Sequence, residues 1–326
     1  MEQQGLPLVS IILLCYNHER FVAEALESVY AQRYPRIELL VVDDASTDNS
    51  CQAVEKFLQD KRVEVPFIKL KENRGNCAAF NQALRRTTGK YIIDLAADDV
   101  LMPGRVEQQV FAFEQLGEDF GVVFSDVLLL NEQSGGIRTF YRRNAEGELL
   151  QQVPEGDVYR HLLARQYISS PAMMMRKSML EELDGYDESL SYEDYDLWVR
   201  SSRKYRYHFI DAVLTGKRLV QHSSRWQFYR KRGNRHLPST LKVCHKARQL
   251  NRTPEEDAAL AVSVRYHLRL SVFTGNKEMA EAFYQLLQKI DRPALADQML
   301  WLLAKLDLPL HFLYARYIDR KLMREG

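Results

Sequence analysis

Residues 90–103, Lys-Tyr-Ile-Ile-Asp-Leu-Ala-Ala-Asp-Asp-Val-Leu-Met-Pro, carry the strongest structural signal in this chain of 326 residues. A mostly apolar run leads into two adjacent carboxylates, Asp98 and Asp99, and Pro103 favours the start of a helix just after them. In α/β folds, ligands bind where buried strands end. Two acids at a strand end therefore indicate either a hard cation held by oxygen ligands or a structural cap, and this stretch alone leaves both open.

Strand and helix patterns alternate on both sides of this stretch. Apolar runs predict strands over residues 8–14, 37–42, 65–70, 91–95 and 121–130. Helical spacing predicts helices between them, over residues 19–32, 48–59, 76–86 and 103–116. We expect Ser46 or Thr47 to cap the second helix and Pro103 to occupy the first position of the fourth. The alternation predicts an α/β fold with a mostly parallel sheet and helices on both faces.

The second half of the chain has a different pattern. Between residues 131 and 235 it is irregular, with predicted strands over 168–175 and 212–220 and a helix over 193–204. From residue 236 it is helical, with Thr253-Pro-Glu-Glu as a strong helix start. Amphipathic helices are predicted over residues 255–275, 277–290 and 293–305. We therefore expect an α/β domain over residues 1–235 and an all-helical C-terminal region over residues 236–326.

Composition excludes several classes of protein. Hydrophobic residues make up 46% of the chain and charged residues 27%, as in soluble globular proteins, and the net charge of +1 argues against general nucleic-acid binding. The four cysteines form no CxxC pair, which argues against a zinc site and suits a reducing cytoplasm. The N-terminus lacks the basic region of a signal peptide, and no run of about 18 apolar residues predicts a membrane span. We expect a cytoplasmic protein.

Two further strand ends carry polar residues. The second predicted strand runs into Val-Val-Asp-Asp-Ala-Ser-Thr-Asp-Asn-Ser at residues 41–50, where a carboxylate could accept hydrogen bonds from a nucleobase or ribose. Turn and capping chemistry is the alternative, because Asp and Ser favour both. The first strand ends in Leu14-Cys-Tyr-Asn without the Gly-rich turn of a dinucleotide site or the Lys of a P-loop. A nucleotide bound here would be held by side chains.

Four segments in order carry a family resemblance: residues 9–17, 41–48, 73–75 (Asn-Arg-Gly) and 95–103. Together they resemble the family 2 glycosyltransferases of the GT-A fold, densely over residues 7–130 and more loosely to about residue 225. The resemblance implies an inverting enzyme with a nucleotide-diphospho-sugar donor, most often a uridine nucleotide, and a Mn²⁺ or Mg²⁺ ion. It also implies a nucleotide-binding half over residues 1–130 and an acceptor half over residues 131–235.

The resemblance assigns roles to residues on the donor side. Asp44 would bond the nucleobase, and the backbone from Leu14 to Tyr16 would line its pocket. Asp99 would bind the metal, with Asp98 on the ribose or also near the metal. Apart from the resemblance, Arg74 follows the third predicted strand and could reach the base or the diphosphate, and a solvated loop arginine is the alternative.

One residue departs from the family pattern on this side, and one candidate ligand lies late in the chain. The family has an acid where this chain has Ala96, so one ribose or metal contact is missing. The two remaining carboxylates suffice for a metal completed by diphosphate oxygens and water. His222, which follows a predicted strand, is a candidate contact to the metal or diphosphate. A structural or exposed histidine is the alternative there.

A second acidic cluster, Ser191-Tyr-Glu-Asp-Tyr-Asp-Leu-Trp-Val-Arg200, opens a predicted helix. Within it, Asp194 matches the position of the family's catalytic base, with Glu193 beside it. Transfer by direct displacement needs one carboxylate to take the proton of the acceptor hydroxyl. An acidic helix start stabilised by the helix dipole is the alternative. Asp196 and Arg200 are expected to form an i,i+4 pair.

Two rival functions and several partners stay open. A nucleotidyltransferase would need a Gly-rich basic loop, which residues 14–20 lack, and Ala96 makes a non-catalytic nucleotide-sugar-binding protein conceivable. The implied acceptor is a carbohydrate or glycolipid of surface-polysaccharide or glycolipid synthesis. The basic segment 222–248 and the C-terminal helices leave open a peripheral contact with the inner face of a membrane, and a solvated loop and helix face is the favoured alternative for the basic segment. Those helices also leave open a homo-oligomer.

Overall fold

The computed structural model describes residues 5–220, 234–306 and 314. Its contacts separate two compact units. The sheet unit comprises Met1–Val158, Ile168–Glu188 and Lys204–Val220, and the helical unit comprises Tyr159–Tyr167, Ser189–Arg203 and Gln221–Gly326. The chain passes between the units more than once, so the helical unit takes in two short segments well before the C-terminal helices. The boundaries expected at residues 130 and 235 stay predictions.

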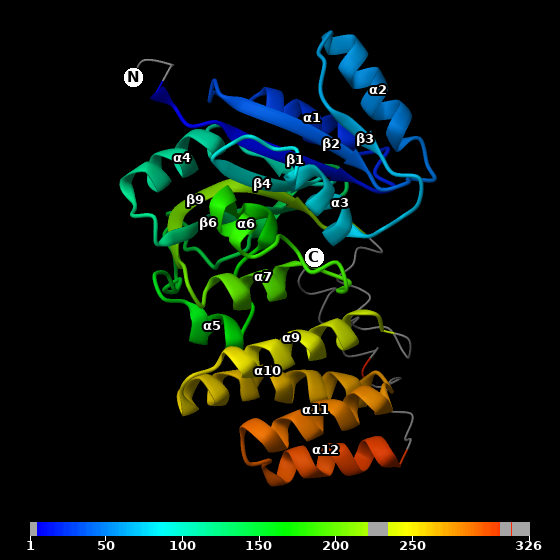
Figure 1. Ribbon diagram of the computed structural model, residues 1–326, viewed down its shortest axis with the longest axis vertical. Helices are drawn as coiled ribbons and strands as arrows, with labels where there is room; N and C mark the ends of the chain where they lie inside the picture. The colour runs from blue at the N-terminus through cyan, green and yellow to red at the C-terminus, as the bar shows by residue number, and fades with distance from the viewer. Residues whose placement is uncertain (1–4, 221–233, 307–313, 315–326) are drawn as a thin grey trace. The chain divides into compact units, whose positions relative to one another are not determined.

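The sheet unit is built on one mixed sheet (Figure 1). Its strands are β1 Val9–Cys15, β2 Ile37–Asp43, β3 Phe67–Lys69, β4 Tyr91–Ala96, β5 Val100–Leu101, β6 Phe120–Leu130, β7 Gly136–Thr139, β8 Met174–Arg176 and β9 Arg206–Arg218. They lie in the order β3-β2-β1-β4-β8-β6-β9-β5, with β7 beside β6. The four strands from β3 to β4 are parallel, as are β6 and β9, whereas β8 and β5 run antiparallel to their neighbours.

Helices cover both faces of this sheet. They are α1 Val22–Tyr30, α2 Ser50–Lys61, α3 Asn76–Leu84, α4 Arg105–Gln115 and α6 Lys177–Glu182. Alternate residues of β1, from Val9 to Cys15, pack with α1 and α4 in the main apolar cluster, and α3 also packs on β1 and β2. Every residue of β1 is buried, which explains why its sequence is apolar apart from Ser10. The predicted α/β class is confirmed.

Two predicted helix starts are wrong. Helix α2 begins at Ser50 with Asn49 as its N-cap, because Ser46 and Thr47 make other bonds. Ser46 Oγ accepts the Asn17 N–H at 2.9 Å, and the Thr47 N–H donates to Asn17 Oδ1 at 2.7 Å, so these residues join the loops after β1 and β2.

Pro103 likewise lies outside its helix. Helix α4 begins at Arg105 with Gly104 as N-cap at a φ of +79°, a conformation that glycine adopts without strain. Pro103 and Gly104 therefore form a turn, and the helix begins at the next residue.

The helical unit contains α5 Tyr159–Ala164, α7 Asp194–Ser201, α9 His236–Leu250, α10 Pro254–Phe273, α11 Lys277–Ile290 and α12 Leu295–Lys305. Helix α10 packs against α5, α9, α11 and α12. Figure 1 shows α9 to α12 stacked in chain order. The predicted start of α10 is confirmed, since Thr253 Oγ1 accepts the Glu256 N–H. Among the described residues, no helix has the length and apolar character to cross a membrane.

Candidate functional site

The carboxyl ends of three parallel strands meet at one edge of the sheet. Leu14 of β1 is paired with Val42 of β2 on one side and with Ala96 of β4 on the other. The Asp44 N–H donates to the Cys15 carbonyl at 2.9 Å, and the Ala97 N–H donates to the Leu14 carbonyl at the same distance. The segments that begin at Asp44 and Ala97 therefore leave the sheet on either side of the end of β1.

Asp44 is buried and takes part in turn chemistry, the alternative that the sequence left open for residues 41–50. Its carboxylate accepts the Arg74 N–H at 2.8 Å and the Gly75 N–H at 2.9 Å. It thus fixes the turn before α3, where Gly75 has a φ of +84°. A carboxylate offers about four acceptor positions, so these two bonds leave acceptor capacity for a ligand N–H.

The other donor-side residues differ in exposure. Leu14 is buried, whereas the Tyr16 ring is 43% exposed at the end of β1. The Arg74 guanidinium is about half exposed and lies 3.4 Å from Glu188, so its charge is already paired with a carboxylate of the sheet unit. Asn81 of α3 also donates to Glu188, at 3.2 Å.

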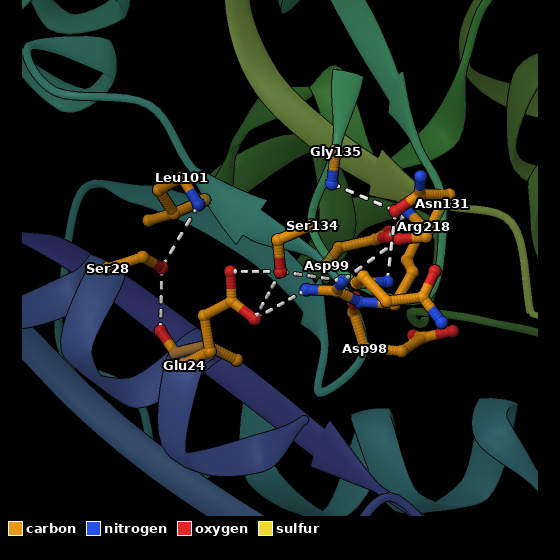
Figure 2. Close-up of polar contacts among 11 residues, drawn as sticks. Glu24, Ser28, Asp98, Asp99, Leu101, Asn131, Ser134, Gly135 and Arg218 are labelled. Carbon is orange, nitrogen blue, oxygen red and sulfur yellow. Dashed lines mark hydrogen bonds and ion pairs between the residues drawn. The ribbon is translucent and has the colours of Figure 1, made fainter. Parts of the chain in front are cut away.

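Asp98 and Asp99 occupy the tight turn between β4 and β5. Asp99 is 4% exposed, and its Oδ1 accepts the backbone N–H of Arg218 at 2.8 Å (Figure 2). Burial, reinforced by the charge of Asp98, raises the pKa of Asp99 to about 8. Asp98 Oδ2 lies 3.9 Å from His18 Nε2. Burial therefore disfavours the charged form of Asp99, beside a second carboxylate in the same turn.

These two carboxylates fit a divalent metal that also binds a ligand. Burial disfavours the ionised form of Asp99, and a bound cation would favour that form. Among the described residues, no group of three or more His, Cys, Asp or Glu side chains could hold a metal ion. The protein would thus supply two carboxylates and leave the other positions to phosphate oxygens and water, as is usual for Mg²⁺. Ala96 adds no ligand, and His222 lies outside the described residues.

Arg218 is the main residue that sequence reasoning missed. It ends β9, is buried, and bonds the Asp98–Asp99 turn, α1 and the turn between β6 and β7. No spacing pattern could have found it, because its partner Asp98 lies 120 positions earlier in the chain.

Glu193 and Asp194 belong to the helical unit. Glu193 is the N-cap of α7, and Asp194 is its first residue, with Oδ1 accepting the Tyr195 N–H at 2.6 Å. The preceding loop is bonded to α9: the Tyr192 and Thr240 hydroxyls lie 2.6 Å apart. Ser191 Oγ lies 2.8 Å from the Nδ1 atom of His236. The predicted base is thus carried by a segment that the C-terminal helices hold.

A buried cluster of ion pairs also joins α7 to α9. Asp196 is 1% exposed and accepts bonds from Arg200 Nε and Lys246 Nζ, both at 2.6 Å. The first of these confirms the predicted i,i+4 pair. The second ties α7 to α9, and the sequence contains no signal for it.

A sequence model described as glycosyl transferase family 2 matches residues 10–183, just over half of the chain. The chain belongs to this family. It is 30% identical over 216 residues to an uncharacterized glycosyltransferase of Methanocaldococcus jannaschii, covering 65% of this chain and 71% of that one. It is 33% identical over 197 residues to EpsE of Bacillus subtilis, named as a glycosyltransferase, covering 60% and 66%. The predicted family and enzyme class of this glycosyltransferase are confirmed.

Solved structures show the same fold at low identity. The mannosyltransferase PcManGT from Pyrobaculum calidifontis, in complex with GDP-Man and Mn²⁺, has a TM-score of 0.57 and 18% identity, covering 98% of this chain and 82% of that one. TarS residues 1–349 of S. aureus, in complex with UDP-GlcNAc, has a TM-score of 0.62 and 19% identity, covering 91% and 79%. These likenesses establish the fold of this glycosyltransferase.

Proposed function

We propose that this glycosyltransferase moves a sugar from a nucleotide-diphospho-sugar, of the UDP-sugar class, to an acceptor hydroxyl by direct displacement with inversion. The observation that carries the proposal is the common edge formed by the ends of β1, β2 and β4. Asp44, which is buried, and the Asp98–Asp99 pair lie on adjacent segments of this edge in a family 2 domain, which supports Asp44 as the proposed nucleobase acceptor.

The nucleobase binds beside Asp44 in this proposal. The N3–H of uracil is a donor that the Asp44 carboxylate can accept, and the exposed Tyr16 ring offers a face for stacking. Leu14 lines the pocket through its backbone. Arg74, half exposed, exchanges its bond with Glu188 for one with the donor diphosphate. Guanine also has ring and amino N–H donors, so a GDP-sugar is the alternative donor to test.

The diphosphate binds beside Asp98 and Asp99. These residues would hold a Mn²⁺ or Mg²⁺ ion, with Asp98 also within reach of the ribose and His222 as a further candidate ligand. The bound ion would offset the negative charge that the leaving diphosphate gains. The low exposure of Asp99 supports this assignment, because burial raises the pKa of this carboxyl and a bound cation would favour its ionised form.

The acceptor is deprotonated by Asp194, with Glu193 as its neighbour in the acidic pair. A carboxylate that removes the acceptor proton on the side opposite the leaving group produces inversion. The acceptor class that we propose is a carbohydrate or a glycolipid of surface-polysaccharide synthesis. All four cysteines are free, which supports a reducing compartment such as the cytoplasm.

The test is a panel of UDP- and GDP-sugars, assayed for binding and for slow hydrolysis in Mn²⁺, in EDTA, and in EDTA followed by excess Mn²⁺. We expect one or more UDP-sugars to be hydrolysed only with metal, and activity to return when Mn²⁺ is added back. Asp60→Asn on the exposed face of α2 serves as a neutral control. Equal hydrolysis in EDTA would refute the metal assignment, and hydrolysis of GDP-sugars alone would refute the UDP assignment.

A further inference from the structure

We infer that Arg218 is a positioning residue that holds the Asp98–Asp99 turn in the shape required for metal binding. This inference rests on the proposed metal site. Figure 2 shows Arg218 between this turn, Ser134 and Glu24. Arg218 would act on the metal site through this turn. Its side chain bonds the backbone carbonyl of Asp98, and its backbone N–H bonds one carboxylate oxygen of Asp99.

The guanidinium of Arg218 joins three separate parts of the sheet unit. Its Nε donates to the Asp98 carbonyl at 3.0 Å. Its Nη1 donates to the Asn131 carbonyl at 3.2 Å and to Ser134 Oγ at 2.9 Å, both in the turn between β6 and β7. Its Nη2 donates to Glu24 of α1 at 2.7 Å. The single guanidinium group of Arg218 therefore links the Asp98–Asp99 turn, α1 and the turn between β6 and β7.

A second link closes this network. Ser134 Oγ donates to Glu24, with oxygen distances of 2.8 and 2.9 Å, so the hairpin turn and α1 are also bonded to each other. The Arg218 guanidinium carbon lies 4.8 Å from the centre of the Phe21 ring, at the start of α1. The buried side chain is thus fixed by hydrogen bonds at its edge and by a ring at its face.

The hydrogen bonds of Arg218 leave the carboxylates of Asp98 and Asp99 available to bind a cation. Arg218 Nε is bonded to the carbonyl of Asp98 and not to its carboxylate. Among the described residues, the Asp99 carboxylate accepts one hydrogen bond, from the Arg218 N–H to Oδ1. The charge of the guanidinium is paired with Glu24 instead. Arg218 can therefore shape the turn without neutralising the carboxylates that a cation needs.

Lysine could not take over this role. An ammonium group is a compact point charge, whereas the guanidinium presents donors in fixed directions. The acceptors around Arg218 belong to three segments, the Asp98–Asp99 turn, the turn between β6 and β7, and α1, and the guanidinium bonds them through three different nitrogens. Arg218→Lys therefore preserves the charge and removes the geometry.

The experiment measures Mn²⁺ binding directly, by electron paramagnetic resonance of free Mn²⁺, with Mn²⁺ alone and with Mn²⁺ plus UDP. We expect Arg218→Lys to weaken Mn²⁺ binding at least tenfold. The matched control is Arg176→Lys. Arg176 is also buried, bonds backbone carbonyls at the opposite end of β4 and stacks on rings, so its loss should not change Mn²⁺ affinity.

If Arg218→Lys does not fold, two milder variants test the positioning role of Arg218. Ser134 has a φ of +62°, which suits glycine, so Ser134→Gly removes the hydroxyl and keeps the turn. Glu24→Gln removes the paired charge, and Glu27→Gln on the same helix is its charge-matched control. We expect both Ser134→Gly and Glu24→Gln to weaken Mn²⁺ binding about threefold or more, whereas Glu27→Gln does not.

The outcomes separate the two proposals. If the unaltered protein binds Mn²⁺ and folded Arg218→Lys binds it as tightly, the positioning role is refuted while the metal site stands. Unchanged binding in both Ser134→Gly and Glu24→Gln refutes it in the same way. If the unaltered protein binds no Mn²⁺ with or without UDP, the metal site itself fails, and the positioning role fails with it.

Discussion

The carboxylate of Asp44 accepts a hydrogen bond from the backbone N–H of Arg74 at 2.8 Å. One predicted donor-site residue thus fixes the backbone of another, 30 positions further along the chain. The side chain of Arg74 points its charge toward Glu188 instead. The base-binding and diphosphate-binding parts of the proposed donor site are therefore mechanically connected through the turn before α3.

Asp44→Asn should weaken nucleotide binding because it removes the charge that a nucleobase N–H would bond. Hydrogen bonds to charged groups contribute roughly 1.5–3 kcal/mol, so affinity for UDP should fall about 10- to 100-fold. Calorimetric titration with UDP measures this. Thermal unfolding should be measured in parallel, because Asp44 also holds the Arg74–Gly75 turn. Unchanged UDP affinity in the folded variant would exclude Asp44 from the nucleobase site.

Ala96→Asp should strengthen metal binding, because it restores an acid at the position that the family usually fills with one. Without metal, the added charge repels Asp98 and Asp99 and should lower the melting temperature. With Mn²⁺, the melting temperature should rise more than in the unaltered protein. Ala96→Asn is the control, since it adds nearly the same volume without charge. Equal responses of the two variants to Mn²⁺ would contradict a cation at this turn.

Asp194→Asn should leave the fold intact and reduce transfer about 10²- to 10⁴-fold, the usual contribution of a general base. The comparison variant is Glu193→Gln, which changes the neighbouring acid at the N-cap of the same helix. We expect a smaller loss there. Both should be assayed at saturating donor so that kcat is measured. If Asp194→Asn retained near-normal turnover, the base would have to be another residue.

The helical unit should lose stability in mild acid through His267. Burial lowers the pKa of this side chain from its usual 6.5 to about 4. Its Nδ1 lies 2.8 Å from the Ser263 carbonyl, and its ring stacks on Phe283. Between these pH values the unfolded chain binds a proton that the folded chain does not. The contribution of neutral His267 is therefore complete above pH 6.5 and lost as the pH falls toward 4.

The size of this effect follows from the pKa shift. A shift of this size corresponds to at most on the order of 3 kcal/mol in unfolding free energy. Denaturant unfolding at pH 7 and pH 5 measures it, with His267→Gln as the variant that cannot titrate. We expect the difference between the two proteins to shrink or reverse at pH 5. A pH-independent difference would mean that His267 is not buried in its neutral form.

The parts of the fold that were predictable are those with a local signal. The strands β1 and β4 are largely buried, so their sequences are apolar apart from Ser10 and Asp94, and their positions are confirmed to within one residue. Strand β5 has two residues, too short for a pattern, and pairs with β9. The strand predicted over residues 168–175 was too long, because only Met174–Arg176 pairs with β4 and β6, as β8. The predicted start of α2 was wrong because Ser46 and Thr47 bond the loop after β1. The predicted start of α4 was wrong because Gly104, with a φ of +79°, is the N-cap.

The candidate site also has a part that the sequence predicts and a part that only the structure shows. The chain order of Asp44, Asp98, Asp99 and Asp194 is visible in the sequence, because each acid follows or opens an element that has a strong pattern. The contacts of Arg218 with Glu24, 194 positions earlier, have no counterpart in any spacing. The same holds for Lys246 and Asp196, which lie on different helices.

The sequence by itself therefore determined the class of fold, the family and the acids at the strand ends, because buried strands and amphipathic helices impose periodicities on neighbouring residues. Only the tertiary structure decided what holds those acids: Arg218 around the Asp98–Asp99 turn, and α9 around the loop that carries Asp194. The reason is physical. A buried polar group must find a partner wherever the folded chain brings one, and packing selects that partner irrespective of its distance in sequence.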